Sequence, residues 1–241
     1  EVLCDLGGAE EENAAHKKFE ENPKSLEYLK VIFGHHAMHL TRYFSNSAHG
    51  AIFRHPIGRL ISHYQFNRSL IDDGLINGPV LPDPRKLTLN EFSSHLLRFA
   101  YSLSIYANGS SEPNPNFMAL SLHKCINHKY ETPTSSECYE NIRSLQYVGL
   151  QEQFNLSVYL LLVKSCTHNN FFNSLKFDIY NQTKNNINFE FLPKWFIKEI
   201  SGHLGLDFDV YNEALELFDA NLSDCFSDER FYKSYVNQMP Y

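Results

Sequence analysis

An arginine and a serine stand eight residues apart where a predicted strand gives way to a predicted helix, in residues 53–64, FRHPIGRLISHY. The guanidinium of Arg54 offers a planar fork of donors that suits a phosphate group, and the hydroxyl of Ser62 adds a further donor. Unpaired backbone N–H groups at a helix N-terminus favour the same kind of ligand. The pair therefore predicts an anion clamp. The alternative is that Arg54 makes a structural salt bridge and Ser62 merely packs, which is the commoner role of an isolated pair of this kind.

The elements that would position this pair are a strand at residues 51–54 and a helix from Pro56 to about Asp72. Proline suits the first turn of a helix, because its missing N–H would have no helical partner there. Apolar side chains follow at helical spacing, at Ile57, Leu60, Ile61, Tyr64 and Leu70. The clamp is thus expected at the carboxyl end of a strand, where ligands gather in open parallel sheets.

Strands and helices alternate along the rest of the chain, which predicts an α/β domain with a largely parallel sheet. A buried strand is expected at residues 29–33 and another at 145–150, with a further possible strand at 175–180. Thr88 and Glu91 have the spacing of a capping box at the start of a helix. The other predicted helices cover residues 9–21, 152–164, 192–202 and 208–217, and loops are expected at residues 73–86, 108–115 and 132–136.

Length and charge exclude several classes of protein. The 241 residues suffice for one good core or at most two small domains. Because 28 acidic residues outnumber 21 basic ones, giving a net charge of -7, no overall field would draw the protein onto nucleic acid or an anionic membrane. No apolar run approaches the roughly 20 residues that a membrane span needs. Any phosphate site must therefore be local.

The cysteines suggest neither a disulfide framework nor a structural zinc site. There are five of them, an odd number, and none of them is in CxxC spacing. A single bridge between Cys125 and Cys138 across a loop remains an open alternative.

Residues 53–64 closely resemble the 3′-phosphate-binding stretch of sulfotransferases that use 3′-phosphoadenosine 5′-phosphosulfate (PAPS). In that family a strand ends in Arg-Asp-Pro, with an arginine three residues after the proline and Ser-x-Tyr beyond it. The branch most similar to this chain holds the uronyl 2-O-sulfotransferases and their bacterial relatives. The sequence departs from the pattern at His55, which replaces the aspartate. The resemblance implies that Arg54 and Ser62 hold the 3′-phosphate.

Four further segments match the family in order, so the resemblance covers roughly residues 29–220. It implies one sulfotransferase-like domain over residues 1–241, a three-layer P-loop-like fold with a largely parallel central sheet flanked by helices. The segment YVGLQEQF at residues 147–154 is similar to a family strand ending in Val-Gly-Leu-Thr-Glu, and LDFDVYNEA at 206–214 to the closing helix. Both are interpreted as fold markers. The polar segment 181–185 falls where the family has a basic loop that folds over the nucleotide, and the resemblance implies that Lys184 adds charge near the 3′-phosphate.

The first of these segments, VIFGH at residues 31–35, implies a catalytic role for His35. In the family the matching histidine takes the proton from the acceptor hydroxyl. An imidazole suits that work because its pKa of about 6.5 leaves it largely neutral near pH 7. His36 is the alternative base. A metal site formed by His35, His36 and His39 is disfavoured, since neither an HExxH pattern nor a supporting cysteine accompanies them.

The family's donor loop has no counterpart before Val31. That loop, of the type Pro-Lys-Thr-Gly-Thr-Ser, holds the 5′-phosphosulfate and follows a strand. Residues 23–25, Pro-Lys-Ser, share two letters with it but lack the glycine and have no predicted strand before them. We expect a truncated sequence, because the other parts are intact. A non-catalytic nucleotide- or partner-binding relative is the alternative.

The resemblance implies a transferase that moves a sulfuryl group from PAPS to a hydroxyl of a carbohydrate, leaving 3′-phosphoadenosine 5′-phosphate (PAP) and needing no metal. The expected partner is a saccharide acceptor, not nucleic acid. Bacterial relatives are cytoplasmic, whereas animal relatives lie in the Golgi lumen behind an N-terminal anchor. The Asn-rich composition and unpaired cysteines favour the cytoplasm.

Overall fold

The computed structural model describes residues 3–6, 21–22, 31–34, 48–106, 116–127, 131–164 and 189–226, together with position 17. The helices and strands in chain order are β1 (Leu3–Leu6), β2 (Val31–Gly34), β3 (Gly50–Phe53), α2 (Pro56–Asp72), η3 (Pro84–Lys86), α3 (Leu89–Tyr106), α4 (Phe117–Asn127), α5 (Ser135–Arg143), β4 (Tyr147–Leu150), η4 (Gln151–Gln153), α6 (Phe154–Lys164), η6 (Phe189–Phe191), α7 (Lys194–His203) and α8 (Gly205–Phe226).

The described strands form two parallel pairs, β1 with β2 and β3 with β4. The predicted parallel pairing is therefore confirmed, and the protein, which is mostly helical, fits a coarse α/β class. The pairs belong to separate two-stranded sheets, so the described strands do not form the single central sheet that was expected. Strand β1 was not predicted, and a strand does precede residues 23–25. Its residues, LCDL, contain no β-branched side chain, and Asp5 interrupts the apolar run.

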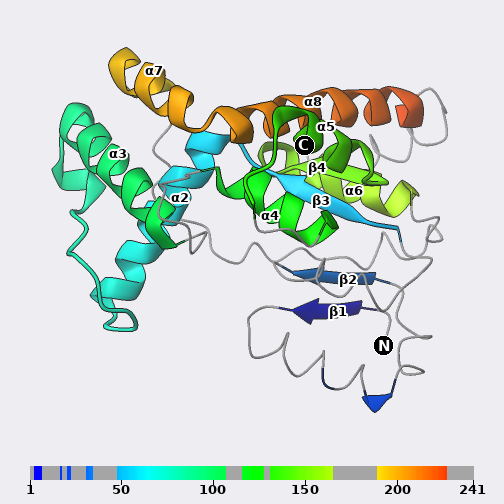
Figure 1. The fold of residues 1–241 in the computed structure, drawn as a ribbon, viewed down its shortest axis with the longest axis horizontal. Coiled ribbons are helices and arrows are strands. Elements are labelled where there is room, and N and C mark those ends of the chain that lie inside the picture. The colour runs from blue at the N-terminus through cyan, green and yellow to red at the C-terminus, as the bar shows by residue number, and fades with distance from the viewer. Residues whose placement is uncertain are drawn as a thin grey trace, which may run out of the picture.

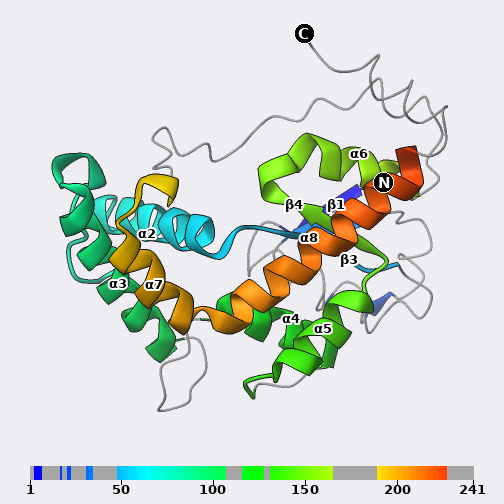
Figure 2. The same ribbon diagram turned by 90° about the horizontal axis from the view of Figure 1, so that it is seen from above.

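Helix α2 begins at Pro56 and ends at Asp72, as predicted. Its buried side chains include Ile57, Leu60 and Tyr64, which recur at the spacing of one helix face. They pack with apolar side chains of α3 and α7 into one core cluster. Figures 1 and 2 show these three helices grouped at one end of the molecule, with β3 leading directly into α2.

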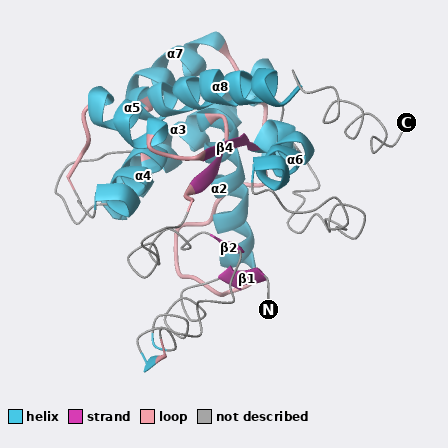
Figure 3. Cartoon of the chain, turned by 90° about the vertical axis from the view of Figure 1, so that its right-hand side faces the viewer, coloured by secondary structure: helices cyan, strands magenta, loops and turns pink. Residues whose placement is uncertain are grey.

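A second core cluster surrounds β3 and β4. Strand β4 is buried along its whole length, because α6 and α8 pack against it. Figure 3 shows β4 lying beneath α8, between α5 and α6. Helix α8 runs from Gly205 to Phe226, well beyond the predicted residues 208–217, and its buried face includes Val210, Ala214 and Phe218.

Capping fixes the starts of two helices. The predicted box at α3 is confirmed, because the Thr88 N–H donates to Glu91 Oε2 at 2.9 Å and the Glu91 N–H donates to Thr88 Oγ1 at 3.3 Å. A second box, between Thr134 and Glu137, starts α5. Helices α4 and α5 were not predicted, and the expected loop at residues 132–136 runs into α5. Helix α5 contains few apolar residues, and the consecutive apolar residues at the start of α4 surround the helix instead of marking one face.

Other expectations meet the structure only in part. Cys138 is a buried free thiol, so the bridge to Cys125 is not formed. The predicted strand at residues 175–180 and nearly all of the helix at 9–21 lie outside the described residues. Among the helices that the structure describes, none is long and apolar enough to cross a membrane.

Candidate functional site

The carboxyl ends of β3 and β4 lie at one edge of their sheet, because the strands are parallel and Phe53 pairs with Leu150. Arg54 and His55 leave β3 there, and α2 begins at the next residue, Pro56. This is the strand-to-helix arrangement that the sequence predicted for an anion clamp.

Arg54 folds back over the first turn of α2. Its Nε atom lies 3.6 Å from the point that a Cβ atom on Gly58 would occupy. The side chain is half-buried, and no described residue hydrogen-bonds or ion-pairs with it. The structural salt bridge considered from the sequence is therefore not formed within this part of the chain. A half-buried guanidinium of this kind retains its donors for an anion.

The N-terminus of α2 is itself suited to an anion. His55 makes no side-chain capping bond there, and the first turn holds no acidic residue. The Arg59 N–H makes the first helical bond, to the His55 carbonyl at 2.8 Å, so the N–H groups of Ile57 and Gly58 precede the hydrogen-bonded ladder. The partial positive charge of the helix end adds to the full charge of Arg54.

Ser62 lies on the same face of α2 as Gly58, one turn further along. With a rise of about 1.5 Å per residue, it stands about 9 Å along the axis from Pro56. Its side chain is half-buried. Arg54, Gly58 and Ser62 thus follow one line along the helix surface. Gly58 adds no side chain of its own there, and the Phe189 ring lies 3.9 Å from the point that its Cβ atom would occupy.

Glu152 occupies the neighbouring strand end, in η4. Its Oε1 accepts the His55 N–H at 2.8 Å, and its Oε2 accepts the Tyr211 hydroxyl at 3.2 Å. Burial raises the pKa of Tyr211, with the negative charge of Glu152 adding to the shift. The carboxylate therefore links the turn between β3 and α2 to helix α8.

The His55 ring is enclosed by aromatic side chains. It stacks on Phe189 with centroids 4.2 Å apart, and it meets Phe208 and Tyr211 edge-on at 5.5 and 5.3 Å. Burial lowers the pKa of His55, and Glu152 opposes this shift. The ring Nδ1 is buried and makes no hydrogen bond to the described residues. His55 is therefore a neutral imidazole, at the position where the family that the sequence resembles has an aspartate.

Arg59, the arginine three residues after Pro56, forms an ion pair within the fold. Its Nη2 donates to Asp207 Oδ2 at 3.2 Å, and its guanidinium lies 5.1 Å from the centroid of the Phe117 ring. Asp207 is fully buried, and its Oδ1 accepts the Ala119 N–H at 2.9 Å. Arg59 therefore joins α2 to α4 and α8.

Of the four site residues proposed from the sequence, the structure describes two. Arg54 and Ser62 share the helix α2 site, whereas His35 and Lys184 lie outside the described residues. Glu152 and Tyr211 were interpreted only as parts of fold markers. The signal for Glu152 was its position two residues after the end of a strand, which matches that of His55 after β3.

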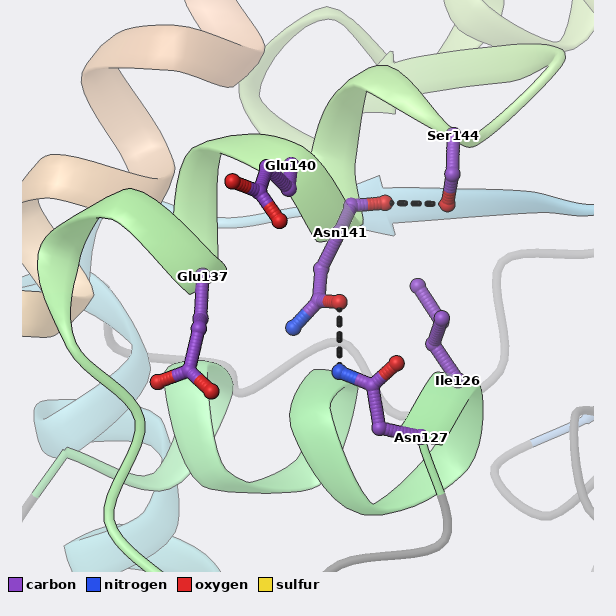
Figure 4. Close-up of a pocket in the computed structure, with 6 residues that line it drawn as sticks. All are labelled: Ile126, Asn127, Glu137, Glu140, Asn141 and Ser144. Atoms are coloured by element: carbon purple, nitrogen blue, oxygen red, sulfur yellow. Dashed lines mark hydrogen bonds between the residues drawn. The ribbon is translucent and has the colours of Figure 1, made fainter.

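A pocket of about 440 Å³ lies elsewhere, between α4 and α5. Its lining residues are Ile126, Asn127, Glu137, Glu140, Asn141 and Ser144 (Figure 4). The Asn127 amide donates to Asn141 Oδ1 at 2.8 Å, and the hydroxyl of Ser144 donates to the Asn141 carbonyl at 2.7 Å. Among its described lining residues two are carboxylates and none is a cation, which does not suit a phosphate, and neither Arg54 nor Ser62 is among them.

Across the described ranges, no group of three or more His, Cys, Asp or Glu side chains is arranged to hold a metal ion. His35, His36 and His39 are outside those ranges. Comparisons of the chain with protein-family models, with curated proteins and with solved structures gave no match.

Proposed function

We propose that this protein is a PAPS-dependent sulfotransferase, in which the end of β3 and the first turns of α2 bind the 3′-phosphate of the nucleotide. The fold that this proposal requires is the three-layer P-loop-like domain of that family, with a central parallel sheet. The function rests on the resemblance together with the geometry around Arg54.

One observation carries the proposal. Arg54 leaves the carboxyl end of β3, lies against Gly58 in the uncapped first turn of α2, and has no anionic partner among the described residues. A guanidinium and a helix N-terminus that face the same space form a site for a doubly charged phosphate. Ser62, one turn further on the same face, supplies a hydroxyl donor to that site.

Binding at this site would serve the reaction by positioning. In sulfuryl transfer the acceptor oxygen attacks sulfur in line, and the bond between sulfur and the bridging phosphate oxygen breaks, leaving PAP. A grip on the 3′-phosphate fixes the donor at a point remote from the reacting bond, and positioning of this kind lowers the barrier by removing freedom of motion beforehand. By analogy with phosphoryl transfer, positioning and charge stabilisation supply most of the acceleration.

The remaining roles follow from the resemblance alone. His35 takes the proton of the acceptor hydroxyl, Lys184 adds positive charge over the nucleotide, and the acceptor is a saccharide. For His35→Ala we expect turnover to collapse while PAP affinity is nearly kept. A mutant that keeps its rate would transfer the role to His36.

The test is calorimetric titration with PAP and, separately, with adenosine 5′-phosphate, which lacks the 3′-phosphate. The wild-type protein should bind PAP at least tenfold more tightly. Arg54→Ala should remove most of that preference, because a charge-assisted hydrogen bond contributes about 1.5 to 3 kcal/mol. Its affinity for adenosine 5′-phosphate should hardly change.

The matched control is Arg98→Ala, which removes an exposed arginine on α3 that bonds only within its own helix among the described residues. It should bind both nucleotides as the wild type does. Equal losses for PAP and adenosine 5′-phosphate in Arg54→Ala, or equal losses in the two arginine variants, would overturn the assignment.

A further inference from the structure

Glu152 has no evident reason to lie beside an anion site. Strands β3 and β4 end in register, so Glu152 stands two residues beyond Leu150 as His55 stands two residues beyond Phe53. Through-space repulsion between its carboxylate and a bound phosphate would weaken binding. Glu152 is therefore expected to have a role at this position whose benefit outweighs the repulsion.

The hydrogen bonds of Glu152 indicate that role. Each carboxylate oxygen accepts one donor, the His55 N–H at 2.8 Å and the Tyr211 hydroxyl at 3.2 Å. His55 is the residue between Arg54 and the first residue of α2, and its backbone has φ -49° and ψ 128°. The bond to its N–H therefore fixes the peptide that follows Arg54, and the bond from Tyr211 fixes the carboxylate against α8.

The side chain of His55 holds the same turn from its other side. Its ring stacks on Phe189 at 4.2 Å with an interplanar angle of 6°. Edge contacts with Phe208 and Tyr211 complete the enclosure. Both the backbone and the ring of this residue are thus held, while the neighbouring Arg54 side chain makes no hydrogen bond to the described residues.

We propose that Glu152 is a positioning residue, which acts through the His55 N–H to fix the direction in which Arg54 leaves β3 toward the first turn of α2. This inference rests on the proposed function, because it assigns Glu152 to the 3′-phosphate site. The carboxylate acts as a hydrogen-bond acceptor, and its negative charge opposes ligand binding. Removing the acceptor and removing the charge therefore have opposite effects.

Three variants separate these effects. Glu152→Ala removes the acceptor and the charge, Glu152→Gln keeps an acceptor without the charge, and Tyr211→Phe removes the donor that fixes the carboxylate. Glu216→Ala is the control, since it removes an exposed glutamate of α8 that makes no hydrogen bond among the described residues. Each is titrated with PAP and with adenosine 5′-phosphate, and exchange of the His55 amide hydrogen is followed by NMR without nucleotide.

For Glu152→Ala we expect PAP affinity to fall about tenfold, which corresponds to about 1.4 kcal/mol, with no change for adenosine 5′-phosphate. The His55 amide should exchange at least tenfold faster. Glu152→Gln should bind PAP as tightly as the wild type or a few-fold more tightly, with the amide still protected. Tyr211→Phe should lie between the alanine variant and the wild type, and Glu216→Ala should match the wild type throughout.

The results that would overturn the positioning role of Glu152 differ from those that would overturn the proposed function. If the wild type prefers PAP and Glu152→Ala keeps that preference, the positioning role is wrong and the proposed function stands. If Glu152→Gln is as weak as Glu152→Ala, a hydrogen-bond acceptor is not what the site requires, and the inference fails. If the wild type shows no preference for PAP, the proposed function fails. In that case unchanged amide exchange in Glu152→Ala also overturns the positioning of the turn.

Discussion

Arg59 and Asp207 form an ion pair across the fold, with 3.2 Å between Nη2 and Oδ2, and the two residues are 148 positions apart in the sequence. The Asp207 carboxylate is fully buried, and 16% of the Arg59 side chain is exposed. Burial raises the pKa of Asp207 and lowers the pKa of Arg59, and each partner opposes the shift of the other. Since Asp207 also accepts the Ala119 N–H, this one pair ties α2, which carries the proposed site, to α4 and α8.

Replacing either partner should destabilise the fold, but not in the same way. Asp207→Asn leaves a buried guanidinium that cannot lose its proton, at a cost of about 3 kcal/mol in unfolding free energy. Arg59→Met leaves a buried carboxyl, which can take up a proton. Its deficit relative to the wild type should therefore shrink as the pH falls from 7 to 5, whereas that of Asp207→Asn should not. Urea unfolding at the two pH values measures both, and parallel deficits at the two values would contradict this account.

His63 should make stability depend on pH. Burial, with a smaller effect from the charge of Arg59, lowers the pKa of His63 to about 4. In the unfolded state the pKa of this histidine is about 6.5, so between pH 4 and 6.5 the unfolded state binds the proton more readily than the folded state does. The contribution of His63 to stability is therefore fully present above pH 6.5 and falls as the pH decreases toward about 4. The contribution lost is on the order of 2 to 3 kcal/mol.

The comparison for this prediction is His63→Phe, because the ring of His63 already packs edge-on against Phe99 and Phe117. Unfolding free energies at pH 7, 6 and 5 should fall less steeply in the variant than in the wild type. Identical slopes would show that His63 does not contribute to the acid sensitivity.

Gly149 should tolerate no side chain, although it lies in a regular strand. A Cβ atom there would stand 2.5 Å from the Tyr147 hydroxyl oxygen and 2.9 Å from Ser157 Cβ. Because both neighbours are buried, Gly149→Ala should cost about 2 kcal/mol of stability. The matched control is Gly202→Ala in α7, where nothing lies within 4 Å of the added atom and alanine should stabilise the helix by about 0.5 to 1 kcal/mol. Thermal unfolding measures both, and two shifts of the same sign would refute the packing argument.

Ser62→Ala should affect the ligand and not the fold. The hydroxyl is half-buried, and alanine favours a helix more than serine does. PAP affinity should fall by about three- to tenfold, as expected for the loss of one hydrogen bond, with stability unchanged or slightly raised. Calorimetry and thermal unfolding of the same sample report the two quantities, and an unaltered PAP affinity would remove Ser62 from the site.

Local pattern predicted the strand-to-helix segment well. The short apolar run before Arg54, the proline at position 56 and the apolar spacing to Tyr64 are local patterns, so the sequence around them suffices. The same holds for the Thr88–Glu91 capping box. Strand β1 was missed because its short pattern acquires meaning only from its distant partner β2, whereas α5 had a local signal, the Thr134–Glu137 capping box, in a segment that was interpreted as a loop.

The site was predictable only where its residues are neighbours in the chain. Arg54 and Ser62 lie on one helix and its preceding strand, but Glu152 reaches His55 across 97 residues and Tyr211 reaches Glu152 across 59. The register of β3 with β4 brings His55 and Glu152 together, and the packing of α8 adds Tyr211. The sequence alone also could not assign Arg59, since its partner Asp207 is fixed by helix packing.

The central claim, that the Arg54 guanidinium and the first turn of α2 bind the 3′-phosphate, is tested most directly by NMR on the intact chain. PAP should shift the resonances of the Arg54 Nε–H group and the Gly58 amide, and adenosine 5′-phosphate at equal saturation should leave both nearly unchanged. Equal shifts with the two nucleotides, or shifts confined to other residues, would contradict the claim.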